Sequence, residues 1–197
     1  MRYTKPGDWI VDQFLGSGTT LIEAKLLNRN AVGLDINFDA IQLSKKNLQF
    51  SCKSSARIFT RQGDARDMAM LKTNSVDFIC THPPYANIIK YSNNLTGDIS
   101  CLPINEFLEA MTLVAEESYR VLKSQHYCAI MIGDIRSKGN VFPLGFNVMQ
   151  KFLKQKFSLH EIIIKEQHNC RSNAYWFTRK TTFLLLAHEY IFVFKKE

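Results

Sequence analysis

The sequence predicts a single α/β domain over residues 1–197, built on a mostly parallel sheet with helices on both faces. Apolar runs typical of strands alternate with helical patterns through most of the chain, as in a parallel sheet with crossover helices. The length of 197 residues suits one domain, because domains usually contain roughly 100–200 residues. A hydrophobic content of 46% is ample for a core, and no repeat, low-complexity tract or linker interrupts the chain.

Each element follows from its own local pattern. Residues 9–12 predict a short strand, and the glycine turn after it leads into a helix that begins at Thr20. Further strands are expected at 31–36, 56–62, 75–81, 127–133 and 159–165, with a last strand or hairpin arm at 182–194. Helices are expected at 39–50, 105–122 and 146–157. Residues 86–103 lack clear periodicity and predict a long surface loop, and such loops tend to be functional.

The composition indicates which class of partner the protein binds and in which cellular compartment we expect it. A formal net charge of +7 favours a polyanionic partner such as nucleic acid, although many soluble proteins are mildly basic. The five cysteines form no C-x-x-C pair, so we expect neither a disulfide framework nor a metal site. The N-terminus has no apolar signal stretch, and His188 and Glu189 interrupt the longest apolar run. We therefore expect a cytoplasmic protein that does not enter the membrane.

Glycines and acids follow the predicted strands, where parallel sheets bind their ligands. Gly16 and Gly18 allow the backbone to approach a ligand closely, while Asp35 ends the second strand and Asp64 follows the third. A dinucleotide site usually has a third glycine where this chain has Leu21, and no lysine follows the glycines as in a P-loop. The pattern favours a nucleoside without a pyrophosphate. In an alternative interpretation, Asp35 caps the next helix and Asp64 is only a turn residue.

Four motifs join these residues into a larger pattern. They are Asp12-x-Phe14-x-Gly16-Ser17-Gly18-Thr19-Thr20, Gly33-Leu34-Asp35, Gly63-Asp64-Ala65 and Thr81-His82-Pro83-Pro84-Tyr85. Together with matches at 119–123, 132–134, 143–146 and 188–194, the pattern resembles the amino-directed DNA methyltransferases, which act on adenine N6 or cytosine N4. The resemblance covers nearly the whole chain. It implies S-adenosylmethionine as cofactor and a Rossmann-like methyltransferase fold whose seven-stranded sheet has its last strand reversed.

The same resemblance implies a cofactor site at the glycine turn. Phe14, Gly16 and Gly18 would line the methionine and ribose parts of S-adenosylmethionine, with Thr19 or Thr20 capping the helix behind them.

The acids and their neighbours complete the implied cofactor site. Asp35 would hold the ribose hydroxyls, and Ile36 would pack on the adenine. Asp64 would accept a hydrogen bond from the adenine amino group with Ala65 beside it, and Asp12 would act indirectly on the sulfonium or amino end. Thr81, which precedes the His-Pro-Pro-Tyr motif, is also assigned to this site.

The resemblance assigns catalysis to His82, Pro83, Pro84 and Tyr85. An exocyclic amino group is a poor nucleophile because its lone pair is delocalised, so acceptors must draw its protons into line. A Pro-Pro turn can aim a backbone carbonyl at the site, and Tyr85 can stack on a base flipped out of the duplex. The family usually has Asp, Asn or Ser where this chain has His82. Either a neutral imidazole accepts the proton, so that activity falls as the imidazole is protonated, or the Pro83 carbonyl accepts it.

Nucleic-acid contacts are expected from two polar segments, since no separate recognition domain is visible. The first contributes Asn87, Lys90 and Tyr91, and the second, residues 168–179, contributes Arg171 and Asn173. Amide and guanidinium groups can contact base edges, and aromatic rings stack on unpaired bases. DNA is the expected partner, and RNA is an open alternative.

The helix that usually precedes the first strand in this family has no counterpart, because only residues 1–8 come before Trp9. We expect weak cofactor binding, a partner subunit or a missing N-terminal segment as a consequence. Two alternative functions stay open: an RNA guanine-N2 methyltransferase on the same scaffold, and a catalytically degenerate nucleic-acid-binding module. A nicotinamide oxidoreductase is less favoured because the third glycine is absent.

Overall fold

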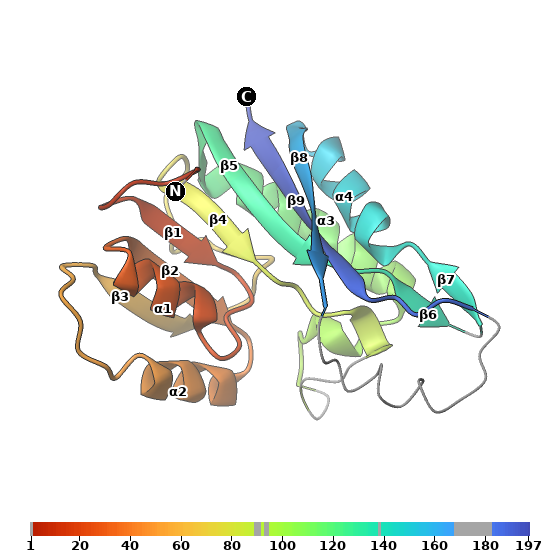
Figure 1. Ribbon diagram of the computed structural model, residues 1–197, viewed down its shortest axis with the longest axis horizontal. Coiled ribbons are helices and arrows are strands. Elements are labelled where there is room, and N and C mark those ends of the chain that lie inside the picture. Colours follow the sequence, from red (N-terminus) through yellow and green to blue (C-terminus); the bar gives the residue numbers. More distant parts are fainter. Residues whose placement is uncertain (1, 89–91, 93–94, 138, 168–182) are drawn as a thin grey trace.

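The computed structural model describes residues 2–88, 92, 95–137, 139–167 and 183–197, and these residues form one seven-stranded sheet (Figure 1). Its strands, in spatial order, are β3 (Ile58–Gln62), β2 (Asn30–Asp35), β1 (Trp9–Asp12), β4 (Val76–Thr81), β5 (Leu122–Ile132), β9 (His188–Lys196) and β8 (Phe157–Glu166). The first five of these strands run parallel, whereas β9 is antiparallel to both of its neighbours. The predicted mostly parallel sheet with a reversed last strand is confirmed.

Helices cover the sheet on both faces, as predicted. They are α1 (Thr19–Leu26), α2 (Phe38–Asn47), α3 (Ile104–Val121) and α4 (Leu144–Lys154). In Figure 1, α1 and α2 lie on one face, while α3 and α4 lie on the other. Each face has its own apolar cluster, and β1 contributes to both because successive strand residues point to opposite sides. Ile10 joins Leu21 of α1, whereas Val11 joins the larger cluster with Phe107 of α3.

The long helix α3 forms because its apolar residues recur on one face. Phe107, Met111 and Val114 follow the i, i+4, i+7 spacing of an amphipathic helix, and all three are fully buried. They meet Phe192 of β9 and Phe152 of α4 in the same cluster. This packing holds the C-terminal half of the chain against the sheet, whose strands β1 to β4 end at the candidate site.

Some elements differ from the sequence-based expectations, including the helix expected at 146–157, which is α4 (Leu144–Lys154) and is followed by β8 from Phe157. Strand β5 begins at Leu122 rather than at residue 127, so it follows α3 without a loop. A small hairpin, β6 (Ile135–Ser137) and β7 (Asn140–Phe142), was not predicted, because three residues are too few to show a periodic pattern. The expected loop at 86–103 contains two short 3₁₀ turns, η1 (Ala86–Ile88) and η2 (Ile99–Cys101).

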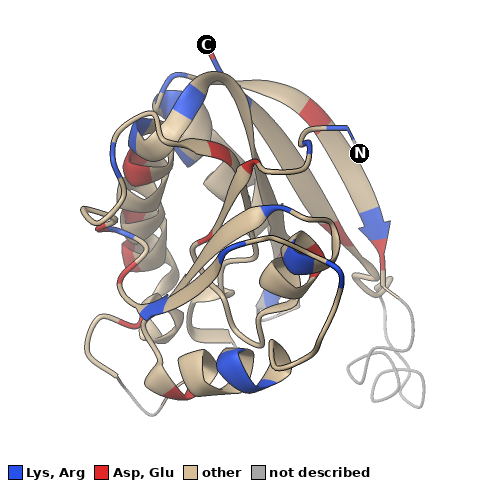
Figure 2. Cartoon of the chain, turned by 90° about the vertical axis from the view of Figure 1, so that its left-hand side faces the viewer, with Lys and Arg blue, Asp and Glu red and all other residues tan. Residues whose placement is uncertain are grey.

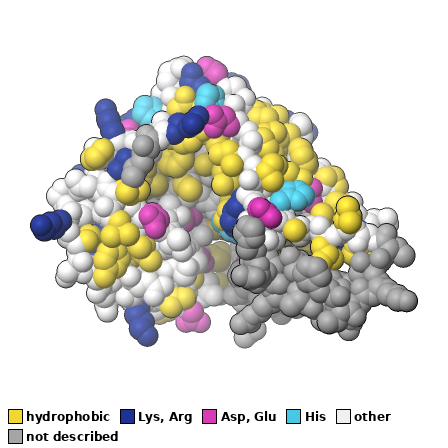
Figure 3. Space-filling model, viewed as in Figure 1, with side chains coloured by type: hydrophobic (Ala, Val, Ile, Leu, Met, Phe, Trp, Pro, Cys, Tyr) yellow, Lys and Arg dark blue, Asp and Glu magenta, His cyan; other side chains and the backbone are white. Residues whose placement is uncertain are grey.

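The surface shown in the figures carries scattered charges and clusters of apolar side chains. Lys and Arg are spread over several elements on the side that carries α1 and α2 (Figure 2). Hydrophobic side chains gather on the face of Figure 3 over β5 and β8. Ile162, Ile163 and Ile164 in β8 are exposed. Within the described ranges, no helix is long and apolar enough to cross a membrane. No group of three or more potential metal-ligating side chains occurs among these same residues.

Candidate functional site

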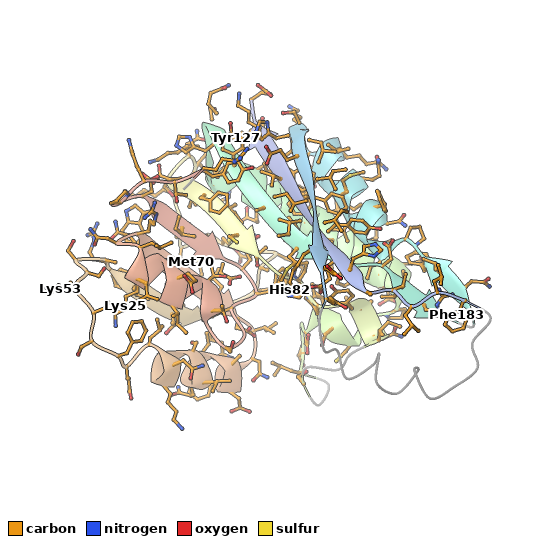
Figure 4. All side chains as sticks on the ribbon, in the orientation of Figure 1. Lys25, Lys53, Met70, His82, Tyr127 and Phe183 are labelled. Carbon is orange, nitrogen blue, oxygen red and sulfur yellow. The ribbon has the colours of Figure 1, made fainter. Side chains whose placement is uncertain are left out.

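A cavity of about 470 Å³ opens at the carboxyl ends of β1 to β4. Parallel sheets bind ligands at this edge, near the point where the strand order reverses. Here that point is β1, because β2 and β4 lie on opposite sides of it. The predicted site residues that line it are Asp12, Phe14, Gly16, Thr19, Thr20, Asp35, Ile36, Asp64, Ala65, His82, Pro83 and Pro84. Figure 4 shows His82 at the centre of the molecule, close to the end of β4. The fold therefore brings most of the two predicted sets to one cavity, whereas Gly18, Thr81 and Tyr85 do not line it.

The carboxylate of Asp35 connects the end of β2 to the glycine turn after β1. The Gly16 N–H donates to Asp35 Oδ2 at 2.9 Å, and the Asn37 N–H donates to Oδ1 at 2.9 Å. Burial raises the pKa of Asp35 above its ordinary value. Each carboxylate oxygen keeps a second lone pair, so the group can accept further hydrogen bonds from a ligand. The alternative that Asp35 caps α2 is wrong, because the N-cap is Asn37 and its side chain accepts from the Asp39 N–H.

The N-terminus of α1 differs from the expectation that Thr19 or Thr20 caps this helix. The N-cap of α1 is Gly18, which has φ +88° and makes no side-chain capping bond, so neither Thr19 nor Thr20 caps the helix. A left-handed N-cap favours glycine, and a Cβ here would lie 2.9 Å from Ser44 Cβ in α2. The Thr20 side chain instead hydrogen-bonds Asp12. Gly18 thus contributes to helix packing, while Thr19 and Thr20 face the cavity.

Asp12 is almost completely buried beneath the cavity, with an exposed fraction of 4%. Thr81 Oγ1 donates to Asp12 Oδ1 at 2.7 Å, and the Phe14 N–H donates to the same oxygen at 3.2 Å. Burial raises the pKa of Asp12, and these hydrogen bonds oppose that rise. Thr81 therefore contacts the site through Asp12, which couples the end of β4 to the end of β1.

Asp64 is held by an arginine that the sequence analysis did not single out. Arg66 Nη2 donates to Asp64 Oδ2 at 2.6 Å, and Arg66 Nε donates to Oδ1 at 2.9 Å. The same Nη2 donates to the Gly97 carbonyl at 3.0 Å. Gly97 has φ +88°, and a Cβ on it would lie 2.8 Å from Ile36 Cδ1. The segment 97–100 consequently forms part of the cavity wall beside Ile36. Gly97 was the sequence signal for this segment, because glycine is the residue that a left-handed conformation favours.

The His-Pro-Pro-Tyr turn is anchored to two other strands through Tyr85. The phenol oxygen accepts from the Gly133 N–H at 2.9 Å, and its own proton is donated to Glu189 Oε1 at 2.6 Å. His82 Nε2 lies 3.3 Å from the phenol oxygen and 3.5 Å from Glu189 Oε1. Glu189 was quoted within a motif but given no role. A glutamate is almost never fully buried unless it is paired, so its position inside the apolar run 183–194 was the signal for it.

The predicted nucleic-acid contacts fall mostly outside the part of the chain that the structure describes. Asn87 is exposed in η1, close in sequence to the catalytic turn. The other four residues, Lys90, Tyr91, Arg171 and Asn173, lie outside the described residues.

The sheet order and the helices on both faces are those of the S-adenosylmethionine-dependent methyltransferase fold. A solved structure described as an S-adenosylmethionine-dependent methyltransferase from Methanosarcina mazei superposes with a TM-score of 0.69. The match covers 98% of this chain and 94% of that chain, at 14% sequence identity. At that identity the likeness concerns the fold alone.

Sequence comparison then gives the family. The family model described as DNA methylase matches residues 1–46 and 76–197. The chain belongs to this family of amino-directed, S-adenosylmethionine-dependent DNA methyltransferases, so the predicted resemblance is confirmed.

Individual relatives are of two kinds. A tRNA (guanine(10)-N2)-dimethyltransferase from Methanothermobacter thermautotrophicus is 34% identical over 124 residues, which cover 62% of this chain and 34% of the relative. The type II methyltransferase M2.DpnII from Streptococcus pneumoniae is 44% identical over 46 residues, covering 23% of this chain and 17% of the relative. The chain matches about a third or less of the length of these two relatives.

Proposed function

We propose that this protein transfers the methyl group of S-adenosylmethionine to an exocyclic amino nitrogen of adenine or cytosine in DNA. One observation carries the proposal: a single cavity is lined both by the glycine turn with its acids and by the His82-Pro83-Pro84 turn. A cofactor held by the first set would present its reactive end to the second. Membership of the DNA methylase family supports the same reaction.

The residues around the cavity fit the cofactor. A volume of about 470 Å³ lies within the roughly 300–1,000 Å³ of small-molecule sites. Asp35 would accept from the ribose hydroxyls, Ile36 would pack on the adenine, and Phe14 and Gly16 would contact the methionine part. When bound, the cofactor supplies an electrophilic methyl group on a positively charged sulfur. Holding the two reactants together lowers the entropic part of the barrier.

Asp64 has a more constrained role than its position after β3 suggested. Arg66 already donates to both carboxylate oxygens of Asp64, so a bound adenine amino group would share this acceptor with the guanidinium. Arg66 also holds the Gly97 carbonyl. We propose that Arg66 keeps the carboxylate and the segment 97–100 in place around the adenine end of the cavity, with Ala65 beside them.

The catalytic turn would act on a base that has left its stack, since its amino group is unreachable inside a duplex. His82 and Pro83 both line the cavity, and the His82 imidazole or the Pro83 carbonyl would accept the amino protons. Drawing those protons away localises the nitrogen lone pair toward the methyl group. The exposed Asn87 and the net charge of +7 support a nucleic-acid partner near this turn.

A second candidate is methylation of the exocyclic N2 of guanine in tRNA. The relative named as a tRNA (guanine(10)-N2)-dimethyltransferase favours it, because it matches 62% of this chain at 34% identity. The chemistry is closely related, since in both reactions a positioned turn activates an exocyclic amino group. The two candidates therefore differ in the nucleic acid and base that enter the cavity.

Transfer of labelled methyl from S-adenosylmethionine to duplex DNA, single-stranded DNA and transfer RNA separates the candidates. We expect label in DNA and little in transfer RNA. Label confined to transfer RNA would move the function to guanine-N2 methylation. Binding of cofactor and nucleic acid without any transfer would support the degenerate binding module, and binding of neither would contradict both enzymatic candidates.

A further inference from the structure

Glu189 is a buried acid that lies beside both His82 and Tyr85 of the catalytic turn. It lies in β9, and its exposed fraction is only 5%. Its Oε2 accepts from Lys165 Nζ at 2.7 Å, and its Oε1 accepts from the Tyr85 phenol at 2.6 Å. Hydrogen bonding with His82, then with Lys165 and Tyr85, holds the pKa of Glu189 well below its ordinary value against the opposing effect of burial. The group is therefore a carboxylate at neutral pH, and it accepts hydrogen bonds only.

The hydrogen bonds around Tyr85 determine the direction of its proton. A phenol oxygen has one proton to donate and two lone pairs. The Gly133 N–H can only donate, and it lies 2.9 Å from the phenol oxygen. The Tyr85 proton is consequently directed to Glu189 Oε1, 2.6 Å away.

His82 faces this pair of acceptors with Nε2. The nitrogen lies 3.3 Å from the phenol oxygen of Tyr85 and 3.5 Å from Glu189 Oε1. Neither oxygen can donate to it, because the phenol proton is engaged and the carboxylate has none. Nε2 must therefore carry the imidazole hydrogen, and in the neutral ring Nδ1 is then the nitrogen with a free lone pair.

We infer that Glu189 is a positioning residue that, together with Tyr85, holds His82 as the Nε2–H tautomer and leaves Nδ1 to accept a proton from the substrate amino group. The inference rests on the proposed function for the identity of that substrate. In the step, the amino nitrogen forms its bond to the methyl carbon as the carbon–sulfur bond breaks and its electron pair stays on sulfur. The released proton passes to Nδ1, and the anionic Glu189 stabilises the resulting imidazolium.

This arrangement accounts for the unusual residue before the two prolines. The family usually has Asp, Asn or Ser there, each with an acceptor oxygen on a short side chain. His82 extends further and has two ring nitrogens, of which only one can accept in the neutral form. An acid from β9 selects which nitrogen that is, in the same way that the Asp of a Ser-His-Asp triad orients its histidine.

The tautomer of His82 is measurable without any activity assay. Nitrogen-detected NMR of the ¹⁵N-labelled full chain, with the His82 signals assigned by their loss in His82→Gln, distinguishes a protonated Nε2 from a protonated Nδ1. We expect a protonated Nε2 in the wild type and a mixture of tautomers in Glu189→Gln. A protonated Nδ1 in the wild type overturns the inference, and this result needs no variant to fold.

Kinetics provide the second readout. Glu189→Gln should lower kcat by about tenfold or more, with the roughly 10²–10⁴-fold that a general base contributes as the upper limit, and leave the Kd for S-adenosylmethionine unchanged. Glu189→Asp should recover part of the lost rate. An unchanged kcat in Glu189→Gln would overturn the inference. If the wild type methylates no nucleic acid, the proposed function fails, while the NMR result still decides the tautomer.

Glu161→Gln is the matched control. Glu161 in β8 also accepts a hydrogen bond from a tyrosine, Tyr3, whose ring packs 5.0 Å from that of Tyr127. Figure 4 shows Tyr127 at the opposite end of the sheet from His82. The control therefore removes an equivalent tyrosine–carboxylate bond away from the cavity, and it should alter neither the His82 tautomer nor kcat. A tautomer change in the control equal to that in Glu189→Gln would show a general effect on folding and contradict the inference.

Discussion

The backbone N–H of Gly16 donates a 2.9 Å hydrogen bond to Oδ2 of Asp35, which ties the turn after β1 to the end of β2. Gly16 has φ +50°, a conformation that glycine adopts without the steric cost of a Cβ. The bond fixes the Asp35 carboxylate at the cavity edge before a ligand arrives. A preorganised acceptor reduces the cost of ordering on binding.

Asp35→Asn should weaken cofactor binding. The substitution keeps the size of the side chain but removes the charge, so the ribose hydroxyls lose a charge-assisted acceptor worth about 1.5–3 kcal/mol. We expect the Kd for S-adenosylmethionine to rise roughly 10–100-fold in isothermal titration calorimetry. Asp39→Asn is the control, since Asp39 is exposed in the first turn of α2. Equal affinities of Asp35→Asn and the wild type would exclude Asp35 from the ribose site.

Gly97→Ala should destabilise the protein and reduce its stabilisation by cofactor. The residue has φ +88°, which costs an alanine about 1–2 kcal/mol, and its Cβ would lie 2.8 Å from Ile36 Cδ1. Gly7→Ala is the control, because Gly7 has φ +89° with nothing within 4 Å of the added Cβ. Urea unfolding with and without S-adenosylmethionine should show a backbone penalty in both variants. Only Gly97→Ala should lose the increase in the urea midpoint that S-adenosylmethionine causes. A similar loss in both variants would contradict the assignment of Gly97 to the wall of the cofactor site.

Tyr85→Phe should separate catalysis from cofactor binding. The phenol joins the Gly133 N–H to Glu189, and its loss leaves a part-buried donor without that partner, at a cost of about 1–3 kcal/mol in stability. We expect kcat to fall while the Kd for S-adenosylmethionine stays the same, because the phenol is directed toward β5 and β9. Tyr119→Phe in α3, where the ring packs on Phe157, should change neither quantity. A weakened cofactor affinity in Tyr85→Phe would place the phenol in the cofactor site instead.

The depressed pKa of Glu189 predicts a pH dependence of stability. Hydrogen bonding with His82, Lys165 and Tyr85 lowers the pKa in the folded state below the ordinary value of 4.5, so folding favours the ionised group. Its stabilising contribution is complete above that ordinary value and is lost as the pH falls through the lower folded value. The difference in unfolding free energy between wild type and Glu189→Gln should therefore be constant near neutrality and shrink below about pH 4.5. A difference that grows on acidification would have the wrong sign.

The sequence was sufficient to predict which residues gather at the cavity. Strand periodicity located β1 to β4, and parallel strands place their carboxyl ends at one edge. Asp12, Asp35, Asp64 and His82 therefore come together although they are far apart in the chain. The reversal of β9 followed from the family resemblance and was not derivable from periodicity.

The partners of those residues could not be predicted in the same way. Glu189 reaches Tyr85 across 104 positions of sequence, and the contact depends on how far β9 extends along β5. Arg66 holds Gly97 through a loop without regular structure. The expected threonine cap on α1 failed because the left-handed backbone of Gly18 moved the helix start by one residue. Side-chain pairing across loops and strand registers depends on tertiary packing that local patterns do not contain.

The most direct test of the central claim is to find the atom that carries the transferred methyl group. DNA incubated with labelled S-adenosylmethionine and the wild-type chain or His82→Ala would be digested to nucleosides and analysed by mass spectrometry. We predict label at N6 of adenine or N4 of cytosine with the wild type, and a large loss of label with His82→Ala at unchanged cofactor affinity. Label on a ring carbon of cytosine, or undiminished amino methylation by His82→Ala, would contradict the account of this catalytic turn.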